Sequence, residues 1–337
     1  MKLITLFSGI GMQEEGLKRA KLDYELINYC EYSSIISKCF SLYHNEPETK
    51  NIGDITKLDI KNYHKELQNK GNGDIDLVIS SFPCKSFSLA GHQKGFDDPK
   101  YGGLFDKSHE FIKQIKPNVV VFENVKSITS PRYKAVEYIR EQMEKIGYTC
   151  YDQVLNSQDY NIPQNRTRWF MICVKKTFST KEFIFPNKIP LKKTMEKDII
   201  DYSFKGERMI NKDMKECFVE ENLNLNKEPT RSGIITLLDA LKEGYVKSGF
   251  LCSKVYSTKG ICPTITCSNH LHLYGKGVKG KLIPLERWRL MGLPENKFKL
   301  LKDNDVSDRQ INIITGNGIV VDVFYHVSKQ LKKIYFK

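Results

Sequence analysis

Short apolar runs alternate with helix-like segments through the first half of the chain, and this alternation restricts the fold more than any other feature of its 337 residues. Runs that are apolar nearly throughout are typical of strands buried on both faces. The predicted strands are residues 3–7, 24–29, 76–80, 118–122 and 169–174, with helix-like patterns at 12–20, 104–115 and 135–146. Because strands that alternate with helices form parallel sheets, the sequence predicts an α/β fold with a Rossmann-like, doubly wound, mostly parallel sheet.

The alternation ends near residue 175, which predicts a second and smaller domain. Residues 181–262 are rich in Lys, Asn and Glu and contain only brief apolar runs. Regular patterning returns at 285–291, and residues 322–334 have the pattern of a closing helix. The expected domains are therefore 1–180 plus 305–337 for the larger one, and 181–304 with a hinge for the smaller one.

The net charge of +13 lies almost entirely in the second half of the chain. Residues 1–173 are nearly neutral, whereas residues 174–337 are strongly basic. This division indicates a catalytic body joined to a segment that binds a polyanion. A lysine-rich solvated surface explains the same charge equally well, so both interpretations stay open on charge alone.

The nine cysteines are scattered and include no Cys-x-x-Cys pair, which argues against a disulfide framework or a zinc site. We therefore expect no metal and a reducing compartment. No apolar run approaches the roughly 20 residues that span a bilayer, and the N-terminus lacks a signal-peptide cleavage pattern. These features predict a cytoplasmic protein with no membrane partner.

A glycine turn follows the first predicted strand. Gly9 and Gly11 would let the backbone approach a ligand, although the full Gly-x-Gly-x-x-Gly dinucleotide pattern is not met. Glu31 lies 20 residues after Gly11, at the end of the second predicted strand, where a carboxylate can hold ribose hydroxyls. Together they indicate an adenosine-bearing cofactor, while the turn alone is equally compatible with a purely structural role.

A thiol and a carboxyl group follow two other predicted strands. Cys84 comes shortly after the strand that ends at residue 80, and Lys85 would favour its nucleophilic thiolate. Glu123 ends the next strand and would need a hydrogen bond or a cationic partner if buried. The segment 164–168 (Gln-Asn-Arg-Thr-Arg) can supply that partner. The plainer alternatives are a core cysteine and a structural salt bridge.

In their order, these segments resemble the motifs of the DNA (cytosine-5) methyltransferase family. The matching segments are Phe7-Ser8-Gly9-Ile10-Gly11 with Glu31, Gly53-Asp54-Ile55, Pro83-Cys84, Glu123-Asn124-Val125, Gln164 with Arg166 and Arg168, Leu285-Glu286 with Arg289-Leu290-Met291-Gly292-Leu293-Pro294, and Gly316-Asn317-Gly318-Ile319-Val320-Val321. The resemblance runs from residue 3 to about residue 325 and leaves out only the basic middle segment. Each motif alone is weakly specific, but their joint order is strongly specific.

The resemblance implies an S-adenosyl-L-methionine-dependent enzyme that releases S-adenosyl-L-homocysteine, with a catalytic and cofactor-binding larger domain and a target-recognition smaller domain. The catalytic residues that it implies are Cys84, Glu123, Asn124, Arg166 and Arg168. The implied cofactor-binding residues are Phe7, Ser8, Gly9, Ile10, Gly11, Glu31, Tyr32, Asp54, Ile55, Pro83, Leu104, Asn317, Gly318 and Ile319. The implied DNA-binding residues are Lys85, Ser86, Ser88, Gln164, Lys254, Tyr256, Ser257, Thr258, Lys259, Thr264 and Ile265.

The implied reaction begins when the Cys84 thiolate attacks carbon 6 of cytosine, which makes carbon 5 reactive. Protonated Glu123 would bond the base, with Arg166 holding the site electrostatically and Asn124 in support. A base inside a duplex cannot reach the pocket, so the cytosine must be flipped out, and the glycine-containing loop 86–104 would close over it. Lys85 departs from the glutamine that is usual in the family; it leaves the nucleophile intact and can contact a phosphate.

Other functions stay open on the sequence alone. The long basic segment argues against the same chemistry on tRNA. The joint presence of Cys84, Glu123, Arg166 and Arg168 argues against a non-catalytic regulator. A nicotinamide oxidoreductase is disfavoured by the missing glycine pattern, and a purely structural DNA-binding protein has no need of the strand-end thiol and carboxyl. We expect a monomer that acts on double-stranded DNA in a bacterial or phage-infected cell, with a cognate restriction endonuclease left open as a partner.

Overall fold

The computed structural model describes residues 1–83, 98, 102–245, 253–268 and 270–336. The chain divides into two compact units. Unit 1 consists of Met1–Leu155, Thr167–Asn187 and Val323–Lys337, and unit 2 of Asn156–Arg166 and Lys188–Asp322. The assignment of catalysis and target recognition to separate domains stays a prediction.

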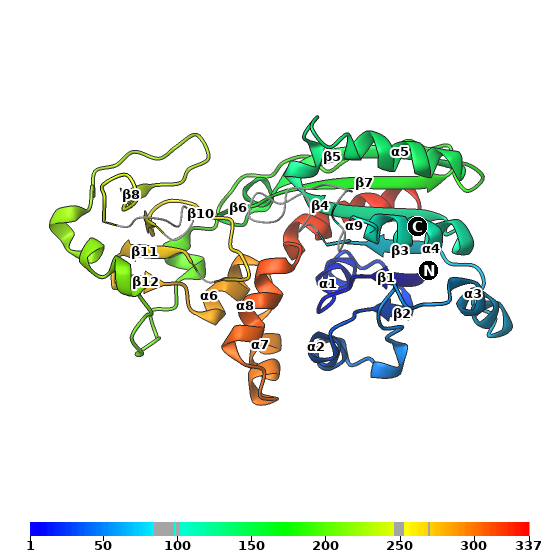
Figure 1. Ribbon diagram of the computed structural model, residues 1–337, viewed down its shortest axis with the longest axis horizontal. Helices are drawn as coiled ribbons and strands as arrows, with labels where there is room; N and C mark the ends of the chain where they lie inside the picture. The colour runs from blue at the N-terminus through cyan, green and yellow to red at the C-terminus, as the bar shows by residue number, and fades with distance from the viewer. Residues whose placement is uncertain (84–97, 99–101, 246–252, 269, 337) are drawn as a thin grey trace. The chain divides into compact units, whose positions relative to one another are not determined.

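Unit 1 contains a six-stranded sheet in the order β2-β1-β3-β4-β7-β5 (Figure 1). The strands are β1 (Lys2–Leu6), β2 (Glu25–Cys30), β3 (Leu77–Ser80), β4 (Val119–Val125), β5 (Tyr148–Asn156) and β7 (Thr167–Lys175). β1 pairs in parallel with β2 and β3, and β3 with β4, whereas β4 and β7 are antiparallel. The predicted α/β fold with a mostly parallel sheet is confirmed.

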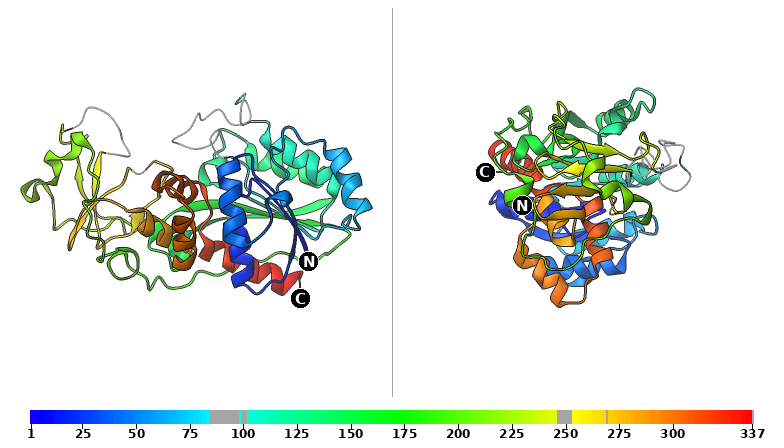
Figure 2. Two further views of the ribbon diagram at one scale, coloured as in Figure 1. Left: turned by 90° about the horizontal axis from the view of Figure 1, so that it is seen from below. Right: turned by 90° about the vertical axis from the view of Figure 1, so that its left-hand side faces the viewer.

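Helices cover both faces of this sheet (Figure 2). Ile4, Val78 and Val120 face a core that they share with helices on one side. Those helices are α3 (Ile60–Asn69), α4 (Leu104–Ile115) and α5 (Ala135–Lys145), and the opposite face carries α1 (Met12–Arg19), α2 (Ser34–His44) and α9 (Val321–Ile334). All of β3 and nearly all of β4 are buried, as their apolar sequences predict.

Unit 2 is built on short strands and three helices. Its four-stranded sheet has the order β12-β11-β9-β8, and a separate pair joins β10 to β6. The elements are β6 (Gln164–Asn165), β8 (Thr236–Asp239), β9 (Lys254–Ser257), β10 (Cys262–Pro263), β11 (His272–Gly275), β12 (Val278–Lys281), α6 (Pro284–Leu290), α7 (Glu295–Asp303) and α8 (Asp308–Asn317). A small core around Phe218, Leu237 and Val255 supports the sheet.

The remaining elements are single turns of helix. The 3-10 turns are η1 (Glu48–Lys50), η3 (Lys126–Thr129), η4 (Ser157–Tyr160), η6 (Lys212–Met214), η7 (Glu216–Phe218) and η8 (Glu220–Asn222), and η5 (Met195–Ile199) is a π-helical turn. Within the described ranges, no helix is both long and apolar enough to cross a membrane.

Candidate active site

The predicted cofactor turn lies between β1 and α1. Phe7, Gly9 and Gly11 all have positive φ angles, of 56°, 57° and 77°. A Cβ atom on Gly11 would lie 2.2 Å from Nε2 of His44, so this position cannot accept a side chain without displacing the histidine. A Cβ on Gly9 would meet no atom within 4 Å. The His44 side chain therefore packs against the turn at Gly11, whereas the space beside Gly9 is open. This arrangement suits a ligand that approaches the backbone.

Glu31 directly follows the last residue of β2 and lies beside this turn. Its Oε2 accepts a hydrogen bond from the Gly9 N–H at 3.1 Å, and its Oε1 accepts one from the Ser33 N–H at 2.9 Å. Burial raises the pKa of Glu31, and the two N–H groups oppose that rise. Each carboxylate oxygen keeps a second lone pair. The carboxylate is thus held rigidly and retains acceptor capacity for ribose hydroxyls, which fits an adenosine-bearing cofactor.

The other predicted cofactor residues of unit 1 differ in exposure. Ser8 and Ile10 are buried, and Oγ of Ser8 donates to the Thr5 carbonyl at 3.0 Å. Phe7, Asp54, Pro83 and Leu104 are half-buried, Ile55 is buried, and Tyr32 is 79% exposed. The carboxylate of Asp54 accepts hydrogen bonds from the N–H and hydroxyl of Thr56. The set therefore combines buried residues that shape the turn with one exposed ring.

Glu123 lies near the carboxyl end of β4 and is buried. Its Oε1 is 3.3 Å from Nε of Arg168, on the neighbouring strand β7. Asn124, also buried, donates from Nδ2 to the Phe82 carbonyl at 3.1 Å and thereby fixes the chain two residues before Cys84. Cys84 itself, with Lys85, Ser86 and Ser88, lies outside the described residues. Unit 1 therefore places a carboxyl–guanidinium pair next to the point where the segment that contains Cys84 begins.

Arg166 bonds within unit 2. Its Nη1 donates to the Ile265 carbonyl, and its Nη2 donates to the carbonyls of Gly316 and Gly318, all at 2.8 Å. Gln164 acts beside it, donating to the Leu290 carbonyl at 2.9 Å and accepting from the Ile265 N–H at 3.1 Å. Of the two arginines in the segment, the ion pair with Glu123 belongs to Arg168, whereas the described bonds of Arg166 go to backbone carbonyls.

Half of the predicted DNA-binding residues in unit 2 are buried. Tyr256, Thr258, Gln164 and Ile265 are buried. Thr258 donates to Oε1 of Glu196 at 2.8 Å, Thr264 donates to the Asn165 carbonyl at 2.5 Å, and Lys254 pairs with Asp239 at 3.2 Å. Ser257 is half-buried, and Lys259 is exposed. These contacts support a structural role for the buried side chains, and Lys259 is the exposed residue of this set.

The predicted closing segment, residues 316–321, begins in the last turn of helix α8. Asn317 is exposed and Ile319 is buried, with Gly318 between them half-buried. Oδ1 of Asn317 accepts from Sγ of Cys267 at 2.7 Å, so the thiol holds this side chain.

Sequence reasoning missed two buried charged groups on and beside helix α6. Arg287 is fully buried, and Arg208 forms a two-point ion pair with the buried Glu286, with Nη2 2.6 Å from Oε1. Neither arginine belongs to a motif that the resemblance singles out. The available signal was three charged residues, 286, 287 and 289, within a single seven-residue helix, and this pattern does not tell which of them is buried.

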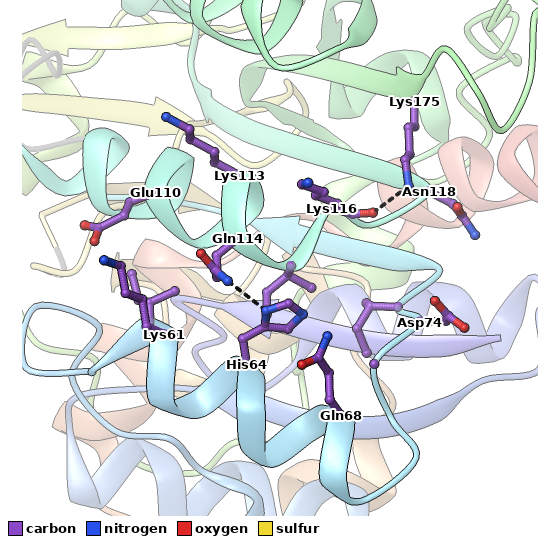
Figure 3. Close-up of a pocket in the computed structure, with 14 residues that line it drawn as sticks. Lys61, His64, Gln68, Asp74, Glu110, Lys113, Gln114, Lys116, Asn118 and Lys175 are labelled. Atoms are coloured by element: carbon purple, nitrogen blue, oxygen red, sulfur yellow. Dashed lines mark hydrogen bonds between the residues drawn. The ribbon is translucent and has the colours of Figure 1, made fainter.

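A large hollow in unit 1 contains none of the predicted site residues (Figure 3). It measures about 960 Å³ and lies between α3 and α4, where Nε2 of Gln114 bonds Nδ1 of His64 at 2.8 Å. Ile75 and Asn118, which precede β3 and β4, also line it. It therefore opens at the amino ends of these strands, whereas ligands of open α/β sheets bind at the carboxyl ends. Among the described residues, no group of three or more His, Cys, Asp or Glu could hold a metal.

The fold has a mostly parallel sheet with a glycine turn after β1 and the Glu31 carboxylate after β2. This combination is typical of enzymes that bind an adenosine-bearing cofactor. The chain belongs to the C-5 cytosine-specific DNA methylase family, whose sequence model matches residues 1–333, and it is an S-adenosylmethionine-dependent DNA (cytosine-5) methyltransferase. The family predicted from the sequence is therefore confirmed.

Individual relatives cover nearly the whole chain. The orphan methyltransferase M.SPRI of Bacillus phage SPR is 32% identical over 87% of this chain and 68% of its own length. The type II methyltransferase M.HhaI of Haemophilus parahaemolyticus is 28% identical over 97% of this chain and 93% of its own. The crystal structure of S. pombe Dnmt2 superimposes with a TM-score of 0.62 at 19% identity, covering 99% of both chains, which supports the fold.

Proposed function

We propose that Cys84 is the covalent nucleophile of this methyltransferase and that Glu123 and Arg168 bind the target cytosine beside it. The observation that carries the proposal is the buried pair of Glu123 and Arg168 at the end of β4, next to the Asn124 bond that fixes the Phe82 backbone. Both features lie at the carboxyl rim of the sheet, where the segment leading to Cys84 starts. A buried carboxyl next to a guanidinium can recognise a polar base edge.

In the proposed reaction, the Cys84 thiolate forms a bond to carbon 6 of the cytosine. A proton from the Glu123 carboxyl passes to the ring nitrogen, so that the electron pair from the ring settles at carbon 5 as an enamine. When bound, S-adenosyl-L-methionine would supply an electrophilic methyl group to carbon 5 and would leave as S-adenosyl-L-homocysteine. Loss of the carbon-5 proton to solvent then re-forms the double bond between carbons 5 and 6 and expels the Cys84 thiolate, and the ring nitrogen returns its proton to the Glu123 carboxylate. Arg168 holds the carboxyl of Glu123 in place through these steps.

The cofactor is proposed to bind at the turn of residues 7–11. The open space at Gly9 admits it, the Glu31 carboxylate accepts from its ribose hydroxyls, and Asp54 with Ile55 adjoins its adenine. Residues 317–319 match the last cofactor motif of the family, and their role in binding the cofactor is proposed on that match. These roles follow the positions that match the family motifs.

The substrate is DNA, and we propose that it is double-stranded, with the target cytosine flipped out of the helix. Lys85, Ser86 and Ser88 are proposed to contact it near Cys84, and Lys259 in unit 2. Gln164, Lys254, Tyr256, Ser257, Thr258, Thr264 and Ile265 are proposed to shape the recognition surface from within. The enzyme is proposed to act as a monomer, and a partner restriction endonuclease, where one exists, would share its target sequence.

Two experiments test the proposal. Incubation with plasmid DNA and S-adenosyl-L-methionine, followed by single-base mapping of 5-methylcytosine, should reveal one recurring target sequence. A duplex that carries 5-fluorocytosine at that target should then form a stable adduct, because fluorine at carbon 5 cannot leave as a proton does. Mass spectrometry should locate the adduct on Cys84, and Cys84→Ala should form none. An active enzyme whose adduct lies elsewhere, or is absent, would remove Cys84 from the mechanism.

A further inference from the structure

Two backbone segments of unit 2 lie directly against each other. The first is the recognition segment, residues 264–267, and the second is residues 316–319 of the closing segment. A Cβ on Gly316 would lie 2.2 Å from the backbone nitrogen of Cys267, so the two backbones touch and only glycine fits there. Each segment has a different proposed ligand, DNA for the first and the cofactor for the second.

The buried guanidinium of Arg166 bonds both segments at once. It is 2% exposed, and it donates to the Ile265 carbonyl on one side and to the Gly316 and Gly318 carbonyls on the other, each at 2.8 Å. The three carbonyls accept from one rigid, planar guanidinium. The recognition segment therefore cannot move relative to the closing segment without breaking at least one of these hydrogen bonds.

Arg287, on helix α6, repeats this arrangement. Its side chain is fully buried, and its Nη2 donates to the Thr266 carbonyl in the recognition segment. Arg287 also bonds helix α8, the helix in which the closing segment begins. Its Nη2 donates to the Asn312 carbonyl at 3.1 Å, and its Nε donates to Oγ1 of Thr315 at 3.3 Å. Burial lowers the pKa of Arg287 to about 10, so the group keeps its charge at neutral pH.

We propose that Arg287, together with Arg166, is a positioning residue that couples target binding to cofactor binding, by tying the recognition segment to the closing segment. The inference rests on the proposed function, which assigns those two segments to DNA and to S-adenosyl-L-methionine. A contact of DNA that fixes residues 264–267 then fixes residues 316–319 as well, and the cofactor binds a segment that is already ordered. By linkage, the cofactor strengthens DNA binding by the same factor.

The test measures the dissociation constant of S-adenosyl-L-homocysteine, by calorimetry, without DNA and with a short duplex that carries the mapped target. We expect the duplex to tighten binding to the wild-type enzyme by at least about fivefold. Arg287→Met should clearly lower this ratio, because only the Arg166 bonds then tie the two segments, while the constant without DNA changes by less than about threefold. A merely structural role would lower the melting temperature and weaken both constants together, leaving their ratio unchanged.

Arg289→Met provides the matched control. Arg289 lies on the same helix, but it donates to the Ile199 carbonyl at 2.9 Å and pairs with Glu295, so it touches neither segment. This variant should keep the wild-type ratio. Arg287→Lys, which keeps the charge but offers no planar fork, should give an intermediate ratio and provides a second variant if Arg287→Met does not fold.

The outcomes separate the two proposals. The coupling would be overturned if the wild-type enzyme gave a ratio of one, or if the Arg287 variants kept the same ratio as the wild type. Methylation of the duplex by the wild-type enzyme would, in either case, leave the proposed function standing. Absence of any methylation and of the Cys84 adduct would instead overturn the proposed function.

Discussion

At the scale of single residues, two strands of the unit 1 sheet each present a buried carboxyl group near or directly after the carboxyl end of the strand. Glu31 and Glu123 stand where apolar runs stop, and the structure places both at the carboxyl ends of β2 and β4. Which arginine pairs with Glu123 depends on the β4–β7 register, which sets Arg168 opposite Val125. Antiparallel register is fixed by packing across the sheet, so a sequence with arginines at 166 and 168 does not reveal it.

The pair of Glu123 and Arg168 leads to a prediction about rate. Glu123→Gln keeps the size of the side chain but removes both the proton donor and the charge that faces Arg168. We expect the methylation rate constant at saturating substrates to fall by about 10²-fold or more, the usual contribution of a general acid. The rate is measured by transfer of labelled methyl groups to the mapped duplex. Glu137→Gln, exposed on α5, is the control, and a wild-type rate in Glu123→Gln would contradict the assignment.

A second carboxyl group, Glu14 on helix α1, predicts how stability depends on pH. Its Oε1 accepts from the Thr5 hydroxyl at 2.7 Å, while Oε2 has no hydrogen-bond partner among the described residues. Burial raises the pKa of Glu14 to about 7, from an ordinary value of 4.5. Between these two values the folded protein keeps a proton that the unfolded chain has lost. The contribution of Glu14 is therefore most favourable in acid and declines as the pH rises to about 7.

The test compares the free energy of unfolding in urea at pH 5 and pH 8. Glu14→Gln keeps the acceptor for Thr5 but cannot ionise, so its stability should exceed that of the wild type at pH 8, by up to about 3 kcal/mol, and much less at pH 5. Glu137→Gln should follow the wild type at both values. Equal pH dependence in Glu14→Gln and the wild type would show that Glu14 does not titrate in this range.

At the scale of elements, the long buried strands and the helices between them follow from their sequences, whereas the short or exposed strands do not. β3 and β4 are apolar because both of their faces are covered. β5 was not predicted, because it is an edge strand in which buried and half-buried residues alternate irregularly. The strands of unit 2 are only two to four residues long, too short for a periodic pattern to stand out.

The turn between β1 and α1 gives a prediction at this scale. Both Gly9 and Gly11 have positive φ, which costs another residue roughly 1–2 kcal/mol. Gly11→Ala adds a clash with His44, so it should lower the free energy of unfolding by clearly more than Gly9→Ala does. Gly9→Ala should instead weaken S-adenosyl-L-homocysteine binding in an otherwise folded protein, because its methyl group enters the space proposed for the cofactor. Urea titration and calorimetry measure the two effects, and equal stability of the two variants would contradict the packing at Gly11.

At the scale of the whole molecule, the uneven distribution of charge agrees with a DNA-binding enzyme and predicts a strong dependence on salt. The affinity for the mapped duplex should fall linearly on logarithmic axes as salt rises. Lys259→Gln should reduce that slope by about 1, because an exposed lysine that contacts a phosphate releases one counterion. Lys61→Gln, an exposed lysine of helix α3 outside every predicted site, is the control and should keep the wild-type slope. An unchanged slope in Lys259→Gln would remove this residue from the DNA interface.

The division of unit 1 into three separate stretches of chain affects how the protein is made. The ribosome completes β1 to β7 first, then the whole of 188–322, and only afterwards the residues that close unit 1. Phe324 of α9, which packs where Gly16 leaves room on α1, is thus made only after the whole of unit 2. The part of the nascent sheet and of α1 that α9 covers stays exposed while unit 2 is synthesised, so slow translation of that stretch would prolong the period in which newly made chains can aggregate.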